Sequence, residues 1–446
     1  MTRKQLRPSL LSRRSLLRGA GTALLGAAGV GLVPGRFSRL LLPEGFGTAS
    51  AAEDPPHDLF FAGTDGWMWL PETPAVGHFH PDVLAPPPFT TYIFGFRNVT
   101  GLTPAQRAAQ KLKAQHSAPI WWVPQYDGTN EFRVALTNLG LGIRPDLTDA
   151  HTVHWHGFRN VVPFFDGEPS GSFGVPAGRV FVYAFRPRHP GTYMYHCHVE
   201  DTEHVQMGMT GIVFVRPLQD GNTALYPSGK YAYNDGDGST GFDREFVMFL
   251  SEVWAESHWC DAHIQLPEWS DYRVDFGLLN GRVWPDTIAP NGSIDPFHPV
   301  TDASGDLLPP GGIERLKYQP FSSLVTCNAG ERVLLRFANL GFREASMATV
   351  GLRLRVVGKD ATLLRGRDGT DGSYEAQHLS FGAGEAIDAI FTAPPHSGGS
   401  GPDVYVLHDR AYRRSDHAAG GNAGGRRTEI RVFPPGTLPP QGFPNT

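Results

Sequence analysis

Residues 179–209 read RVFVYAFRPRHPGTYMYHCHVEDTEHVQMGM and contain two strand-like runs separated by a turn. Both runs are rich in aromatic and β-branched residues, and the segment RPRHPG between them has residues typical of turns. The second run ends in His196, Cys197 and His198, and His204 and two methionines follow closely. This concentration of nitrogen and sulfur donors predicts a metal site at the end of a strand.

The same strand pattern extends along most of the chain. From residue 118 onward, short β-branched and aromatic runs alternate with Gly, Asn, Asp and Pro at intervals of about ten residues, which is typical of an antiparallel sandwich. The 53 glycines and 38 prolines favour many turns over long helices. One helical pattern stands out, TPAQRAAQKLKAQ at residues 103–115. The chain is therefore expected to be all-β.

An internal repeat indicates two copies of one β-sandwich. Residues 330–351 parallel residues 130–157, because each segment has a strand that ends in Asn-Leu-Gly and a later strand that ends in glycine. Residues 401–410 parallel residues 190–199 in the same way. The expected organisation is a first domain at 56–218, a loop-rich linker at 219–243 and a second domain at 244–436.

The N-terminal region, residues 1–51, resembles a twin-arginine export signal. Arg13 and Arg14 precede a stretch rich in glycine and alanine, and Ala49-Ser50-Ala51 is a small-x-small cleavage pattern. The alternative is a membrane anchor, but residues 19–33 are too short and too rich in glycine to span a bilayer. We therefore expect a periplasmic or extracellular protein without a membrane span.

Charge and cysteine content narrow the functional classes. The net charge of −5 has no basic surplus, which argues against a nucleic-acid-binding protein. Only three cysteines are present, so disulfides do not provide the framework of the fold. Cys260 and Cys327 can either pair or remain free buried thiols. Cys197 lies between two histidines, and this favours a role as a metal ligand.

Strand alternation sorts the donors of two segments into two clusters. In an extended chain, successive side chains point to opposite faces. In residues 151–157, HTVHWHG, His154 and His156 then share one face and His151 takes the other. In the second segment, Cys197 points away from its two flanking histidines. The sulfur ligand and the paired histidines should therefore lie on opposite sides of one sheet.

The first cluster has the composition of a blue-copper site, namely two histidines, a thiolate and a methionine thioether. Its members are His151, Cys197, His204 and Met209. Met207 is the alternative methionine, and Met209 is preferred because Gly208 before it permits a close approach of the backbone.

The second cluster combines four histidines, two from each segment: His154, His156, His196 and His198. A zinc site is the alternative to copper here. Because His196 and His198 flank Cys197, only a few covalent bonds separate the two clusters.

The motifs HTVHWHG at 151–157, FFDGEPSGSFGVPAGRVFVYAFRPRHPGTYMYHCH at 164–198 and the histidine–methionine spacing that follows resemble the multicopper oxidases. The similarity is to two-domain members with the blue copper in the first domain, and to the related copper nitrite reductases, over about residues 116–435. It implies two cupredoxin-like Greek-key sandwiches and a homotrimer. It also implies that the first cluster binds type 1 copper, and that the second belongs to an interdomain copper cluster that reduces oxygen to water.

The second domain departs from that family pattern. Alignment of the two repeats places Ala345, Ala348 and Val350 opposite His151, His154 and His156, and Arg410 opposite His198. Only His408, opposite His196, is retained, so five of the eight histidines expected for a full three-copper cluster are present. His156, His196 and His408, the last from a neighbouring subunit, are the set that a mononuclear type 2 copper would use. The second copper centre is therefore trinuclear, mononuclear or absent.

The expected function is that of an exported, laccase-like copper oxidoreductase that oxidises phenolic, amine or metal-ion donors and reduces dioxygen. An electron would enter near His204 and pass through Cys197 to His196 and His198. The alternatives are a copper nitrite reductase, although that family has an aspartate at the position of His154, and a non-enzymatic blue-copper electron carrier. Four, two and one copper ions per chain distinguish the three.

Overall fold

The computed structural model describes residues 54–72, 75–129, 131–411 and 425–446, of which Pro55–Thr446 belong to one compact unit. The expected export signal, residues 1–51, lies outside the described residues. Within the described part of the chain, no helix is both long enough and apolar enough to cross a membrane.

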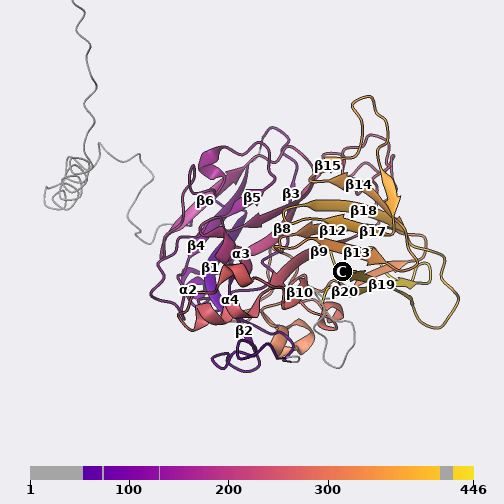
Figure 1. The fold of residues 1–446 in the computed structure, drawn as a ribbon. Helices are drawn as coiled ribbons and strands as arrows, with labels where there is room; N and C mark the ends of the chain where they lie inside the picture. Colours follow the sequence, from indigo (N-terminus) through magenta and orange to yellow (C-terminus); the bar gives the residue numbers. More distant parts are fainter. Residues whose placement is uncertain (1–53, 73–74, 130, 412–424) are drawn as a thin grey trace, which may run out of the picture. The chain divides into compact units, whose positions relative to one another are not determined.

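The first half of the unit is a sandwich of two four-stranded sheets (Figure 1). One sheet has the order β2 (Thr91–Asn98), β1 (Leu59–Met68), β4 (Phe132–Asn138), β6 (Val180–Phe185). The other has the order β3 (Trp121–Pro124), β8 (Thr210–Arg216), β7 (Gly191–His196), β5 (His154–His156). The two strands expected within residues 179–200 are thus β6 and β7, and they lie in different sheets.

The second half is another sandwich. Its larger sheet has the order β10 (Phe276–Leu279), β9 (Arg244–Val253), β12 (Arg332–Asn339), β18 (Ala386–Thr392), β14 (Leu354–Lys359), β15 (Thr362–Leu363), with β16 (Tyr374–Ala376) also on β14. Its smaller sheet has the order β11 (Val325–Asn328), β20 (Arg427–Phe433), β19 (Asp403–Asp409), β13 (Ala345–Thr349), β17 (His378–Phe381). No strand or helix lies between Arg216 and Arg244, all of whose residues are described.

The pairing pattern repeats between the two sandwiches. The parallel pairs β1/β4 and β3/β8 of the first recur as β9/β12 and β11/β20 in the second. His154 on β5 lies opposite His196 on β7, and Ala348 on β13 lies opposite His408 on β19. His408 therefore occupies the strand position in the second sandwich that His196 occupies in the first.

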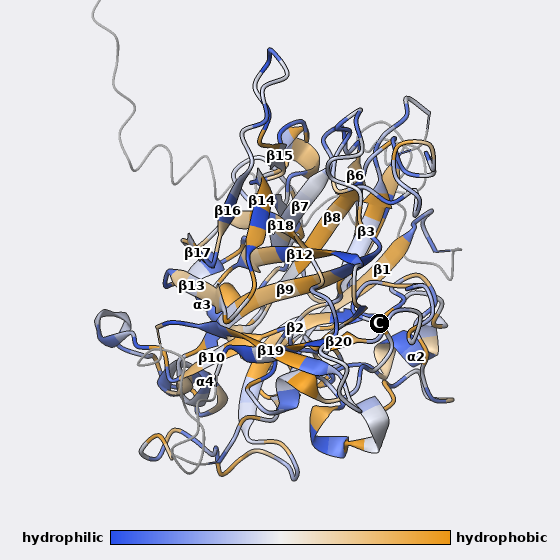
Figure 2. Cartoon of the chain, turned by 90° about the vertical axis from the view of Figure 1, so that its right-hand side faces the viewer, coloured by the Kyte–Doolittle hydropathy of each residue, from blue (hydrophilic) through white to orange (hydrophobic). Residues whose placement is uncertain are grey.

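Each sandwich has its own apolar core, and a third cluster joins them. Phe61, Trp121 and Trp155 are among the buried residues of the first core. The joining cluster contains Phe214 of β8 and Phe249 of β9. Figure 2 shows hydrophobic colour along β8 and β9. Burial of side chains from both halves in one cluster fixes the two sandwiches against each other.

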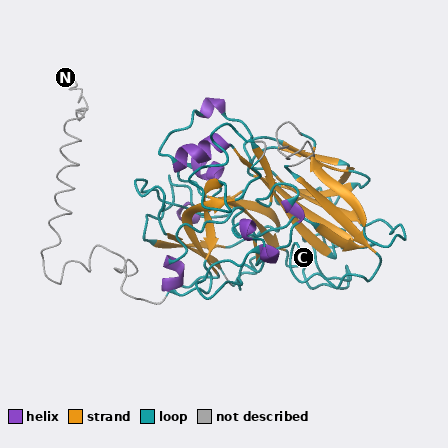
Figure 3. Cartoon of the chain, turned by 90° about the horizontal axis from the view of Figure 1, so that it is seen from below, coloured by secondary structure: helices purple, strands orange, loops and turns teal. Residues whose placement is uncertain are grey.

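Helices are few and short, and they gather on one side of the described unit (Figure 3). They are α2 (Pro104–Ala108), α3 (Asp201–Met207) and α4 (Ala255–Ala262). Single 3₁₀ turns occur at Pro163–Phe165, Trp269–Asp271, Asp286–Ile288, Pro310–Gly312 and Glu314–Leu316. The helix expected over 103–115 was wrong in length, because α2 ends at Ala108, and the left-handed conformation of Leu112 (φ 66°) excludes a helix through that residue.

The fold settles whether the cysteines pair. All three cysteines are free and buried, so Cys260 and Cys327 do not pair.

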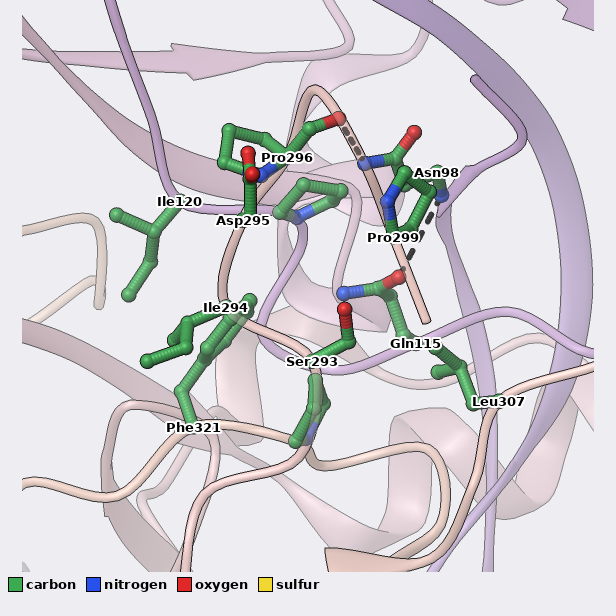
Figure 4. A pocket seen from close by; sticks show the side chains of 12 residues that line it. Asn98, Gln115, Ile120, Ser293, Ile294, Asp295, Pro296, Pro299, Leu307 and Phe321 are labelled. Atoms are coloured by element: carbon green, nitrogen blue, oxygen red, sulfur yellow. Dashed lines mark hydrogen bonds between the residues drawn. The ribbon is translucent and has the colours of Figure 1, made fainter. Parts of the chain in front are cut away.

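A small cavity lies where the end of β2 meets residues 293–299 (Figure 4). There the Asn98 side chain donates to the carbonyl of Pro296 (2.8 Å). At about 10 Å³ this cavity has room for no more than one water molecule, so it is not a substrate pocket.

Candidate metal centres

Three buried side chains converge at one end of the first sandwich. His151 lies in an isolated bridge with Val175, Cys197 directly follows β7, and His204 lies in α3. One ligand atom from each of the three lies within 4.8 Å of the others, and all three side chains are fully buried. The Sγ of Cys197 is 3.2 Å from Nδ1 of His204. This arrangement brings together three of the four ligands proposed for the first cluster.

The local electrostatics favour a thiolate at Cys197. Burial acts to raise the pKa of this thiol, but the imidazoles of His204 and His151 overcome it and hold the pKa well below its usual value. Burial acts to lower the pKa of His204, yet the Cys197 sulfur and Asp149 raise it to about 10. These shifts favour an ionised Cys197 beside a protonated His204, and a bound cation would take the place of the imidazole proton as the counter-charge of the sulfur.

The donor set fits a soft metal ion such as copper. Both ring nitrogens of His151 are buried and make no hydrogen bond with any described residue, although buried polar atoms normally have a partner. The backbone N–H of Cys197 donates to the carbonyl of Met209 (3.1 Å), and that of Met209 donates to the carbonyl of His204 (2.9 Å). These bonds fix the positions of three donors relative to one another. A thiolate with two imidazoles and a thioether selects copper over harder ions.

Gly63 of β1 lies under this cluster. A Cβ atom at Gly63 would be 2.6 Å from Cδ2 of His151 and 3.3 Å from Cε of Met209. The absence of a side chain therefore leaves the space that the imidazole and the methionine methyl occupy. This contact also places Met209 beside His151.

A second group of donors lies on the other side of the same strands. One ring nitrogen each from His154, His156 and His196 lie within 4.8 Å of one another. Nδ1 of His154 donates to the carbonyl of Asp166 (2.8 Å), and Nδ1 of His196 donates to the carbonyl of Cys197 (2.8 Å). With Nδ1 engaged, each of these two rings has Nε2 available to a metal ion.

Burial favours the neutral form of the histidines in this second group. Burial lowers the pKa of His196 to about 3, and it also lowers the pKa values of His154 and His156. Neutral imidazoles are the form that binds copper or zinc. The ring of His198 lies 5.0 Å from that of His154, but its nitrogen is not part of the trio. The structure thus brings three of the four first-domain histidines together.

His408 is placed as the alignment of the repeats indicates, but apart from the trio. Its strand partner is Ala348, so no second imidazole lies opposite it. Nδ1 of His408 lies 3.2 Å from the carbonyl of Asp409, as Nδ1 of His196 lies beside that of Cys197. Among the described residues of one chain, no group of potential metal donors includes His408.

The second sandwich has an ion-pair cluster where the first has its sulfur ligand. Asp409 corresponds to Cys197, and its backbone N–H donates to the carbonyl of Arg426. The Arg426 guanidinium contacts Asp409 (3.2 Å) and Glu252 (3.0 Å), and all three side chains are buried. The N–H of Ser346 donates to Asp409 (3.2 Å), just as the N–H of Thr152 donates to Cys197 Sγ (3.4 Å). A guanidinium and two carboxylates therefore occupy the position equivalent to the first cluster.

Three residues near the clusters were not anticipated from the sequence: Gly63, Thr152 and Asp149. The hydroxyl of Thr152 accepts a hydrogen bond from the N–H of His198 (2.8 Å). Asp149 lies 3.6 Å from Nε2 of His204, and this imidazole lowers the pKa of the Asp149 carboxyl. Asp149 and Thr152 lie within two residues of His151 in the sequence, but no local pattern distinguishes them from their neighbours.

Comparison with known proteins agrees with this site. A sequence model of a family described as multicopper oxidase matches residues 135–220, which include the ligands of both groups in the first sandwich. Copper resistance protein A of Pseudomonas syringae pv. tomato is 42% identical over 72 residues, which are 16% of this chain and 11% of that protein. Laccase 1 of Metarhizium acridum (strain CQMa 102) is 37% identical over 173 residues, which are 36% of this chain and 25% of that protein.

Solved structures extend the similarity to the fold. The blue copper oxidase of Nitrosomonas europaea matches with a TM-score of 0.54 and 19% identity, over 84% of this chain and 85% of that one. The multicopper oxidase mgLAC gives a TM-score of 0.54 and 20% identity, over 86% and 87%. The expected all-β fold of two cupredoxin-like sandwiches is confirmed. The chain spans a quarter or less of the length of the two curated relatives described above.

Proposed function

Residues 135–220 belong to the multicopper oxidase family, and from this premise we propose that the protein is a copper-dependent oxidoreductase that takes single electrons from a donor and passes them to dioxygen. The observation that carries the proposal is the placement of a buried thiolate group and a histidine trio on opposite sides of β5 and β7. This arrangement suits two metal centres within a few bonds of each other.

His151, Cys197, His204 and Met209 would hold the type 1 ion, and His154, His156, His196 and His198 would contribute to a second centre. Copper bound at these places supplies one-electron oxidation and reduction. The protein provides an ionised sulfur, neutral imidazoles and exclusion of water from Cys197, which is fully buried. The hydrogen bond from His196 to the carbonyl of Cys197 holds the two ligands in a fixed relation.

A copper nitrite reductase is the second candidate, and one observation favours it. In the second sandwich His408 is retained at the position of His196, whereas Ala348 replaces the partner that His154 provides in the first. Three imidazoles, from His156, His196 and the His408 of a neighbouring copy, would suffice for one type 2 copper.

The proposal also includes the assembly and location of the protein. The chain would form a homotrimer and be exported through the twin-arginine route to the periplasm or beyond. Its domains would span residues 56–218 and 244–436.

Metal content tests the proposal directly. The purified protein should contain copper, absorb strongly in the visible range and consume oxygen with a phenolic or amine donor. Cys197→Ser should abolish the visible absorption while the fold, measured by circular dichroism, is retained. Four copper ions per chain support the oxidase and two support the nitrite reductase. One ion without oxygen uptake or nitrite reduction contradicts both and indicates an electron carrier.

A further inference from the structure

A pocket of about 550 Å³ lies on the larger sheet of the second sandwich, and this volume is typical of small-molecule sites. Residues of β12, β18 and β14 line it, together with Ser239 from the segment between the sandwiches. Arg332 of β12 lies opposite Thr392 of β18, and Arg355 of β14 lies opposite Ile390 of β18. Paired residues, and residues two apart on a strand, point to the same face of a sheet. Both arginines therefore project from the face that forms the pocket.

The charged side chains that line the pocket are mostly basic: Arg332, Arg353, Arg355 and Glu375. Arg353 lies 4.0 Å from Glu375, and Arg355 contacts Asp371 (3.0 Å). No ion pair within the described part of the chain includes Arg332. Three guanidinium groups are thus accompanied by two carboxylates, and a positive charge remains without a counter-charge.

The carbonyl of Ser239 brings two of these guanidinium groups together. It accepts a hydrogen bond from Nη2 of Arg332 and another from Nη1 of Arg355 (3.2 Å). The ring of Tyr226 lies against the first guanidinium, with its centre 4.9 Å from Cζ of Arg332. Burial lowers the pKa of Arg332, and the adjacent positive charge of Arg355 lowers it further. Two like charges therefore meet at one neutral oxygen, an arrangement that a bound anion would stabilise.

We infer that this pocket is a binding site for a phosphate group, held by Arg332, Arg355 and Arg353. Guanidinium groups bind phosphate oxygens through paired N–H donors, and these charge-assisted bonds are stronger than neutral ones. Among the described residues, the Arg332 side chain donates only to the carbonyls of Gly238 and Ser239, so further N–H groups remain for a ligand. The site lies in the second sandwich and does not depend on the proposed function.

The phosphate group can be free or belong to an organic molecule. Leu352, Ile390 and Pro394 add apolar surface to the pocket, on which the organic part of a phosphate monoester would lie. Inorganic phosphate and phenyl phosphate distinguish the two sources. Tighter binding of phenyl phosphate identifies a monoester as the ligand, whereas equal binding identifies free phosphate.

Isothermal titration calorimetry of the copper-loaded protein with inorganic phosphate, at constant ionic strength, tests the site. We expect saturable binding that Arg332→Gln weakens at least about tenfold, because a charged, forked donor is lost. Arg332 also holds the backbone at Ser239, so Arg353→Gln serves as a second variant. The Arg353 side chain is 66% exposed and its pair with Glu375 is long, so the fold should be retained while phosphate binding weakens about threefold.

Arg431→Gln is the matched control, because Arg431 pairs with a single glutamate, Glu429 (2.7 Å), and lies in the smaller sheet, away from the pocket. It should bind phosphate as the wild type does. The visible absorption should stay constant in all variants and throughout the titration, which separates this pocket from the proposed copper centres. The inference is overturned if the wild type shows no saturable phosphate binding, or if Arg332→Gln and Arg353→Gln both bind phosphate with wild-type affinity.

Discussion

Gly63 illustrates how much the metal site depends on a residue that contributes no side chain. Gly63→Ala should displace the His151 ring, because the added Cβ would lie 2.6 Å from Cδ2. We expect reduced type 1 copper content and weaker visible absorption, measured together with circular dichroism to verify the fold.

The control for this change is Gly401→Ala. A Cβ at Gly401 meets no atom within 4 Å, so copper content and absorption should equal those of the wild type. Full visible absorption in Gly63→Ala would contradict the role assigned to Gly63.

Buried neutral histidines make stability depend on pH. Burial lowers the pKa of His258 to about 4, whereas an unfolded chain gives a histidine its ordinary pKa of about 6.5. Below pH 6.5 the unfolded state binds a proton that the folded state does not, so the free energy of unfolding falls as the pH drops to about 4.

His258→Gln should remove this contribution. Between pH 6.5 and 4 the free energy of unfolding falls with decreasing pH in both proteins. In the variant this fall should be smaller by about 1.4 kcal/mol per pH unit. Urea unfolding at several pH values measures the difference. Parallel pH profiles for the two proteins would show that His258 becomes protonated without unfolding.

For individual residues, the sequence predicted the proposed metal ligands better than the residues that surround them. The His-Cys-His motif is local, so its ligand types could be recognised directly. Asp149, Gly63 and Thr152 depend on contacts between segments distant in sequence, and no local pattern identifies such contacts.

The ends of strands β5 and β7 explain where strand alternation predicted side-chain directions accurately and where it did not. His154, His156 and His196 lie on paired strands and converge, as alternation requires. His198 lies two residues beyond the end of β7, where alternation no longer determines direction, and its nitrogen falls outside the trio. His204 lies in the helix α3, whose seven residues are too few for a helical periodicity to be visible in the sequence.

Strand β20 and the residue before it offer a matched pair of arginines. Arg426→Met should cost about 3–5 kcal/mol of unfolding free energy, because it leaves the buried carboxylates of Asp409 and Glu252 without a counter-charge. Arg431→Met removes a half-exposed partner of Glu429 and should cost less than about 1 kcal/mol. Chemical denaturation of both variants measures the difference, and equal costs would contradict a structural role for the buried cluster.

Across the whole described unit, the two sandwiches share both an apolar cluster and a buried ionic network. Arg336 of β12 contacts Glu245 of β9 (3.0 Å) and Asp388 of β18 (3.4 Å), and Asp388 also accepts a hydrogen bond from Thr192 of β7. The repeat in the sequence indicated two sandwiches. It did not indicate this network, whose members are up to about two hundred residues apart along the chain and belong to no motif.

The shared core predicts cooperative unfolding of residues 55–446. Phe249→Ala should lower the stability of both halves by about 3–5 kcal/mol, since it opens a cavity between them. Calorimetry should give one transition that moves to lower temperature as a whole. Two resolved transitions, of which only one moves to lower temperature, would show that the two sandwiches unfold independently.

The guanidinium of Arg426 has a consequence for the order in which the protein matures. The second sandwich neutralises its buried acids, Asp409 and Glu252, with its own Arg426. In the first sandwich, the favoured charges are an ionised Cys197 and a protonated His204, which balance each other. A bound metal ion would replace the proton of His204. Because both halves balance these charges within the chain, we expect the metal-free chain to fold and copper to bind afterwards, which circular dichroism of the metal-free protein tests.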